Sequence, residues 1–143
     1  MPRNRILIVD DEANIGRSLR LILEREGYVV SVCGSLAECR AHPETARSDL
    51  LLLDIRLPDG NGIDLLRELR AAGNTAEVVM ISGHGTITEA VEATRAGAFD
   101  FLEKPLGRDR VLVAVKNALE QVALRAENAR LRELVEQSPR NKS

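Results

Sequence analysis

Aromatic residues are nearly absent from this sequence. Its 143 residues include no tryptophan, and the aromatic side chains are those of Tyr28, Phe99 and Phe101. A hydrophobic core must therefore be built from leucine, isoleucine, valine and alanine, and the stacked aromatic platforms that bind single-stranded nucleic acids are excluded. The length is that of one ordinary domain, so a second full domain is not expected.

Long apolar segments are missing as well. No run approaches the roughly 18 residues that a membrane-spanning helix needs, and no signal peptide follows Met1. Cysteine is scarce as well. Cys33 and Cys39 lack the closely spaced partner ligands of a structural zinc site. We therefore expect a soluble, cytoplasmic protein with two reduced thiols and no membrane partner.

The formal net charge of -2 is unevenly distributed. Residues 1–105 carry a net charge of -5, whereas residues 106–143 carry +3. The acidic main body argues against a broad DNA-binding face. We interpret the basic tail as a solvated helix face.

Five short apolar runs alternate with helical patterns along the chain. The runs have the composition of buried strands and comprise residues 5–9, 28–33, 50–53, 78–81 and 99–102. Helical spacing follows each run, with capping-box patterns at 35–38 and 86–89. Because parallel strands need crossovers of this length, the sequence predicts an α/β domain with a parallel sheet.

Charged or hydroxyl groups follow four of the five predicted strands. They are Asp10, Asp11 and Glu12 after the first strand, Asp54 after the third, Ser82 after the fourth and Lys104 after the fifth. Parallel strands end at one edge of the sheet, where such folds bind ligands. A solvated loop explains any one of these residues but not their shared edge.

The carboxylates at this edge call for a cation, since each would otherwise raise the pKa of the others. Mg²⁺, with Mn²⁺ as an alternative, prefers oxygen ligands and leaves positions for phosphate oxygens. A lysine and a hydroxyl beside the metal suit phosphoryl transfer. Asp54 stands singly after the most hydrophobic strand and is the predicted nucleophile. Asp10 and Asp11 are the predicted metal ligands, joined by Asp54 and the backbone carbonyl of Arg56.

In combination, these motifs resemble the receiver domains of two-component response regulators. The similarity covers about residues 4–118 and includes the acidic turn at 8–12, the acceptor strand and loop at 53–62, and the Lys104-Pro105 pair. It implies a flavodoxin-like fold with strand order 2-1-3-4-5. It also implies a cis peptide bond between Lys104 and Pro105.

The resemblance further implies a partner and a reaction. A sensor histidine kinase would supply a phosphoryl group to Asp54, with Mg²⁺ bound by Asp11 and Asp54 and with Asp10 acting through water. Lys104 and Ser82 would then contact the phosphate oxygens.

A conformational switch is also implied. Inward movement of Ser82 would let Phe101 rotate, which would remodel the face formed by the helix at 86–97, the strand at 99–102 and the helix from 108. Arg56 and His84 flank the route of the attacking water and are expected to set how long the phosphate lasts. For His84, an exposed loop histidine is the alternative.

The last helical pattern runs from about residue 108 to Gln137, before Ser138-Pro139. Apolar residues at steps of four and three predict a coiled-coil seam that comprises Val115, Leu119, Val122, Ala126, Ala129 and, after a shift in phase, Leu131, Leu134 and Val135. An amphipathic helix folded back on its own domain is the alternative. We therefore divide the chain into a receiver domain at 1–118 and a linker at 119–143. A homodimer is expected through the linker and the switch face.

A long helix after the receiver resembles the linker of the nitrogen-regulation class of sigma-54-dependent activators, as do segments 83–86 and 96–105. The output domains of that class would follow Ser143, so DNA and sigma-54 RNA polymerase would be reached only through them. The chain has no P-loop motif, and we expect a self-phosphorylating switch without turnover of an external substrate.

Three other functions fit parts of the pattern. A Mg²⁺-dependent phosphatase commonly has a second aspartate two residues after the nucleophile, where this chain has Arg56. A flavin-binding domain needs a glycine- and hydroxyl-rich phosphate loop in place of the acidic turn at 10–12. A receiver used only for docking would not need Asp54, Ser82 and Lys104.

Overall fold

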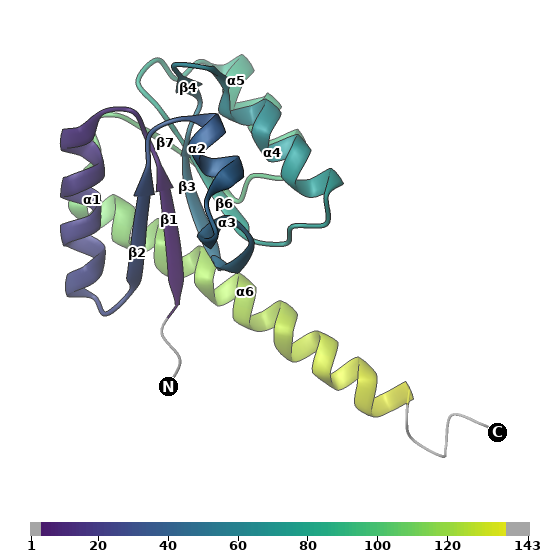
Figure 1. Ribbon diagram of the computed structural model, residues 1–143. Coiled ribbons are helices and arrows are strands. Elements are labelled where there is room, and N and C mark those ends of the chain that lie inside the picture. Colours follow the sequence, from purple (N-terminus) through teal and green to yellow (C-terminus); the bar gives the residue numbers. More distant parts are fainter. Residues whose placement is uncertain (1–3, 137–143) are drawn as a thin grey trace.

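The computed structural model describes residues 4–136, which form a five-stranded parallel sheet with helices on both faces (Figure 1). The strands are β1 (Arg5–Val9), β2 (Val29–Cys33), β3 (Leu50–Asp54), β6 (Glu77–Ser82) and β7 (Asp100–Glu103). They are arranged in the order β2-β1-β3-β6-β7, and every neighbouring pair is parallel. Counted as five βα units, this is the order 2-1-3-4-5, so the predicted flavodoxin-like fold is confirmed.

Six helices connect or follow these strands. They are α1 (Ala13–Arg25), α2 (Leu36–Ala41), α3 (Glu44–Arg47), α4 (Gly62–Ala71), α5 (Ile87–Arg95) and α6 (Arg108–Glu136). Helix α1 and the first half of α6 cover one face of the sheet, while α2, α4 and α5 cover the other (Figure 1). The core is therefore divided into two apolar layers, one on each side of the sheet.

The central strand β3 shows why the sequence has an unbroken apolar run. Leu51 and Leu53 point into the layer under α2 and α4, whereas Leu50 and Leu52 point into the layer under α1 and α6. All four side chains are fully buried. A strand that is covered on both faces needs apolar residues at every position, and Asp54 follows at its carboxyl end.

Side-chain caps begin the helices that follow the loops. Ser35 Oγ accepts a hydrogen bond from the backbone N–H of Glu38, and Thr86 Oγ1 accepts one from the N–H of Glu89. These contacts confirm the two predicted helix starts, since such caps satisfy backbone donors that have no partner inside the helix. Asn61 caps α4 in the same way.

A short antiparallel ribbon follows β3. It pairs β4 (Arg56–Leu57) with β5 (Gly60–Asn61), where the turn chemistry of the sequence predicted only a loop. Further along the chain, the peptide bond between Lys104 and Pro105 is cis, as predicted.

Helix α6 continues without a break past the predicted end of the receiver domain at residue 118, and its second half extends away from the sheet (Figure 1). Val115 and Leu119 are buried in the core of their own domain, so the predicted coiled-coil seam is wrong at these two positions. The first half of the helix follows the alternative of a helix folded back on its domain. The division at residue 118 stays a prediction.

The exposed apolar residues of α6 lie on its other side. Leu124 and Leu131 are 62% and 45% exposed, and their spacing of seven places them on one face. Counted at about 100° per residue, this outward face is opposite the one that buries Val115 and Leu119. The predicted helix end at Ser138-Pro139 lies outside the described residues.

Within residues 4–136, none of the helices is both long enough and apolar enough to pass through a membrane.

Candidate functional site

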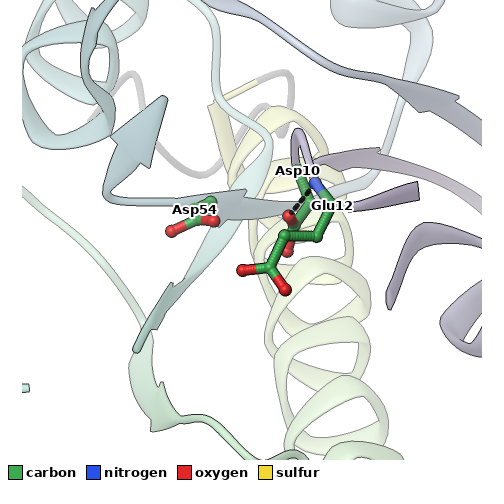
Figure 2. Close-up of side chains that lie close together, drawn as sticks. All are labelled: Asp10, Glu12 and Asp54. Atoms are coloured by element: carbon green, nitrogen blue, oxygen red, sulfur yellow. Dashed lines mark hydrogen bonds between the residues drawn. The ribbon is translucent and has the colours of Figure 1, made fainter. Parts of the chain in front are cut away.

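The carboxyl ends of β1 and β3 bring two buried carboxylates together. Asp10 follows β1 and Asp54 ends β3, and each residue is only 3% exposed. Glu12, which is exposed, reaches toward them from the turn before α1 (Figure 2). Carboxylate oxygens of these three residues lie within 4.8 Å of one another. The edge of the sheet thus gathers acidic groups, as the sequence predicted.

Lys104 joins the three carboxylates. Its Nζ lies 3.0 Å from Asp54 Oδ2, 3.0 Å from Glu12 Oε1 and 3.2 Å from Asp10 Oδ2. Burial alone would lower the pKa of Lys104, but its hydrogen bonds to Glu12 and Asp54 outweigh that effect and raise the pKa above the ordinary value. The ammonium group is therefore held in its charged form between the acidic side chains.

The surroundings of Asp10 raise the pKa of its carboxyl group. Burial raises its pKa, and the nearby charge of Asp54 adds to the increase, whereas the N–H of Glu12 and the ammonium of Lys104 oppose it. The Glu12 N–H donates to Asp10 Oδ1 at 2.8 Å (Figure 2). Asp10 Oδ2 is buried and accepts no hydrogen bond from the described residues, although it lies near Lys104.

The donor set fits a hard divalent cation. It consists only of carboxylate oxygens, and the Oδ2 atom of Asp10 accepts no hydrogen bond from the described residues, although Lys104 Nζ lies 3.2 Å away. Mg²⁺ and Mn²⁺ prefer such oxygen ligands, whereas a site for a softer metal would include cysteine or histidine.

Asp11 does not join this group. The residue is exposed, and its carboxylate is not among the clustered ones, whereas Glu12, which was not predicted as a ligand, is. The acidic run at 10–12 contained the signal for Glu12, but the run alone does not show which side chains turn inward. The predicted ligation by Asp11 and by the Arg56 carbonyl stays a prediction.

The turn that follows Asp54 is tightly packed. The backbone N–H of Arg56 donates to Asp54 Oδ1 at 3.2 Å, and the N–H of Gly62 donates to Ile55 O at 2.7 Å. A Cβ atom at Gly62 would lie 2.2 Å from the carbonyl oxygen of Asp54, so only glycine fits there. These contacts fix the backbone on both sides of the Asp54 carboxylate.

The predicted switch residues lie on the two neighbouring strands. Ser82 ends β6 and is fully buried, and its Oγ accepts a hydrogen bond from the N–H of His84 at 3.1 Å. The N–H of Lys104 donates to the carbonyl oxygen of Ser82 at 2.8 Å, which ties the two strand ends together. Phe101 is half-buried and packs against the layer under α4, and His84 is exposed.

Arg56 links the turn after Asp54 to helix α5. Its guanidinium Nη2 lies 3.4 Å from Glu89 Oε2, and the Arg56 side chain is 61% exposed. The capping-box pattern of the sequence indicates only a helix-capping role for Glu89, because a contact between residues 33 positions apart leaves no local pattern.

The comparisons with known proteins agree with this geometry. A family model described as "Response regulator receiver domain" matches residues 6–116. The chain is 42% identical to the nitrogen assimilation regulatory protein NtrX of Azorhizobium caulinodans and 39% identical to the alginate biosynthesis transcriptional regulatory protein AlgB of Pseudomonas aeruginosa. Each match covers 92% of this chain but only 29% of the relative, so the chain spans less than a third of these proteins.

Solved structures give the same result. A crystal structure of NtrX from Brucella abortus matches 96% of this chain and 31% of that chain, with a TM-score of 0.85 and 36% identity. The beryllofluoride-activated NtrC4 receiver domain dimer matches 82% of this chain and 98% of that chain, with a TM-score of 0.78 and 36% identity. The sheet order, the acidic edge and the family match over most of the sequence lead to one conclusion: this chain belongs to the response regulator receiver domain family.

Proposed function

We propose that the chain is a phosphorylation-controlled signalling switch in which Asp54 accepts a phosphoryl group from a sensor histidine kinase. The observation that supports this most is the position of Asp54, which is buried, contacted by Lys104 and adjacent to a second buried carboxylate. By analogy with its relatives, which are described as transcriptional regulators, the switch controls an attached transcription-activating output module.

Asp10 and Asp54 are the proposed carboxylate ligands of Mg²⁺, together with Asp11 and the backbone carbonyl of Arg56. Glu12 is an additional candidate because its carboxylate already lies in the cluster. Bound there, the metal would supply positive charge to the phosphoryl oxygens. Mn²⁺ would serve in the same way.

The reaction is a transfer between two nucleophiles. A carboxylate oxygen of Asp54 attacks phosphorus, the new O–P bond forms as the P–N bond of the donor phosphohistidine breaks, and the leaving imidazole takes up a proton. Lys104 shifts its Nζ from Asp54 Oδ2 to a phosphoryl oxygen and stabilises the charge there. Hydrolysis later returns the free carboxylate and releases inorganic phosphate.

The response begins at Ser82. Its hydroxyl, which now accepts a hydrogen bond from the N–H of His84, turns toward the phosphate and donates to one of its oxygens. Phe101 then moves into the space that is released, and the face formed by α5, β7 and α6 changes shape. Arg56 and His84 border the acceptor site and set the lifetime of the phosphate.

The switch face and the outward side of α6 are the proposed dimer contacts. Ile87 and Val91 of α5 are 85% and 44% exposed, and Leu124 and Leu131 are exposed on α6. A receiver domain of similar fold forms a dimer in its beryllofluoride-activated state. The partner proposed for these surfaces is therefore a second copy of this chain.

The acceptor role can be tested by mass spectrometry after incubation with acetyl phosphate and Mg²⁺. We expect the mass gain of one phosphoryl group, and this group should be lost in base. Asp54→Asn should abolish it, whereas Asp64→Asn, which changes an exposed aspartate of α4, should not. A chain that stays unmodified under these conditions would contradict the proposed function.

A further inference from the structure

A second buried carboxylate site lies at the opposite end of the sheet from Asp54. Glu77 is the first residue of β6, pairs with Leu50 at the amino end of β3 and is only 2% exposed. A carboxylate that is removed from water in this way is strongly unfavourable unless a cation stands beside it. The reaction proposed at the carboxyl ends of the strands does not use this group.

Two arginines from different helices face Glu77. Arg125 Nη2 of α6 lies 3.1 Å from Glu77 Oε2, whereas Arg70 Nη2 of α4 lies 4.0 Å from Oε1. Arg70 is engaged elsewhere, because its Nη1 donates to the carbonyl oxygens of Asn74 and Ala76 at 3.1 and 2.6 Å. Glu77 Oε2 accepts no hydrogen bond from the described residues, so its charge is balanced by ion pairing alone. By distance, Arg125 is the nearer of the two cations.

Arg125 lies beyond the part of α6 that is buried against the sheet. The residue lies six positions after Leu119, the last buried residue of the helix, and so about 9 Å further along its axis. It also lies beyond residue 116, where the match to the receiver family ends. The contact thus joins the receiver body to the segment that was predicted to be a separate linker.

We propose that the ion pair between Glu77 and Arg125 clamps residues 119–125 of α6 to the receiver body. These residues then move with the body, and the rest of α6 leaves the domain in one fixed direction. The boundary between the body and the free part of the helix accordingly lies after Arg125 and not at residue 118. This inference is independent of phosphorylation at Asp54.

Hydrogen–deuterium exchange of the backbone amides at 119–126 tests the clamp in the full chain. Leu131→Glu is included in every sample, so that contacts between two copies do not protect the helix. Arg125→Ala should accelerate exchange at 119–126 by at least about tenfold, because it leaves the Glu77 carboxylate without its nearer cation. Arg132→Ala, at an exposed position on the same helix, should leave these amides unchanged.

Unchanged protection in Arg125→Ala would overturn the proposal. In a Glu77→Gln background, which has no buried charge, Arg125→Ala should add little further exchange, and a full additional increase would also overturn it. If Glu77→Gln does not fold, hydrogen–deuterium exchange of Arg125→Glu tests the proposal instead. The reversed charge should repel Glu77 and accelerate exchange beyond Arg125→Ala, and a smaller effect would contradict the clamp.

Discussion

Lys104 and Asp54 lie fifty residues apart in the sequence, yet Lys104 Nζ is 3.0 Å from Asp54 Oδ2. The ammonium group contacts the same carboxylates that are proposed to bind a metal and a phosphoryl group. In this structure the lysine is thus the cation that balances the carboxylates of Asp10 and Asp54.

Lys104→Gln should increase the affinity of the chain for Mg²⁺ several-fold. The substitution removes the repulsion between an ammonium group and a divalent ion, and it frees the carboxylate oxygens that the lysine now contacts. Isothermal titration calorimetry measures the change, with Lys116→Gln on the exposed side of α6 as the control. Weaker binding in Lys104→Gln would show that Lys104 does not compete with the metal.

Ser82→Ala should leave Asp54 able to accept a phosphoryl group. Phosphorylation should then no longer change the position of Phe101. The chain contains only two phenylalanines, so fluorine NMR of fluorophenylalanine-labelled protein gives two signals. Beryllofluoride should shift the Phe101 signal in the unmodified chain and in Ser82→Thr, but not in Ser82→Ala. A persistent shift of Phe101 in Ser82→Ala would mean that the hydroxyl does not start the switch. Phe99, at the surface, serves as the internal reference.

Gly62→Ala should destabilise the fold by about 1–3 kcal/mol and slow phosphorylation of Asp54. The new methyl group would collide with the backbone carbonyl of Asp54, which cannot rotate away as a side chain can. Urea unfolding gives the free energy of unfolding, and acetyl phosphate labelling gives the rate. Gly107→Ala, where a Cβ meets no atom within 4 Å, should change stability by less than about 0.5 kcal/mol. Equal effects of the two substitutions would contradict the steric argument.

Asp59 should contribute a pH-dependent part of the stability. Its carboxylate oxygens accept hydrogen bonds from the backbone N–H groups of Leu36 and Ala37 at 2.8 and 2.9 Å, and these bonds lower its pKa. Because the folded-state pKa is below the unfolded value of about 3.9, the contribution is complete above that pH and disappears as the pH falls through the folded-state pKa.

Asp59→Asn should therefore lower the melting temperature at pH 7, and the difference from the unmodified chain should shrink as the pH falls below about 4. Thermal unfolding followed by circular dichroism at a series of pH values measures this. Asp64→Asn controls for the loss of one surface charge. A difference in melting temperature that stays constant with pH would show that the charge of Asp59 does not contribute to the stability.

Substitutions on the two sides of α6 should have opposite effects on dimer formation. If the outward face forms the contact, Leu124→Glu with Leu131→Glu should abolish the dimer, whereas Ala126→Glu with Ala129→Glu should not. Sedimentation velocity of the unmodified and beryllofluoride-treated proteins measures the oligomeric state. The reverse result would favour a contact through Ala126 and Ala129, which belong to the part of the predicted seam before the shift in phase.

Local patterns were sufficient where the structure depends on local interactions. The run at Leu50–Leu53 predicted a strand covered on both faces, and the hydroxyls of Ser35 and Thr86 predicted two helix starts. The acidic edge was predictable too, because residues that follow parallel strands must meet there. Asp10 and Lys104 were identified by this reasoning alone.

Local patterns were insufficient where two distant segments, or the course of a turn, decide the outcome. The spacing of Val115 and Leu119 correctly defines an apolar face of a helix, but periodicity does not say whether that face covers its own sheet or a second chain. The pairing of Glu77 with Arg125 joins residues 48 positions apart, and no local pattern links them. Likewise, the choice between Asp11 and Glu12 depends on the backbone of one turn.

Because α6 is a continuous helix, the number of residues after the receiver body sets the rotational orientation of whatever follows it. If residues up to Arg125 are fixed to the body, each residue inserted after that point would rotate a downstream domain by about 100° about the helix axis. Inserting seven residues would nearly restore the original facing, whereas inserting two would point the domain to almost the opposite side. The spacing between this receiver and any fused module is therefore a matter of angular phase as well as distance, which sets the lengths at which chimeric regulators can be joined.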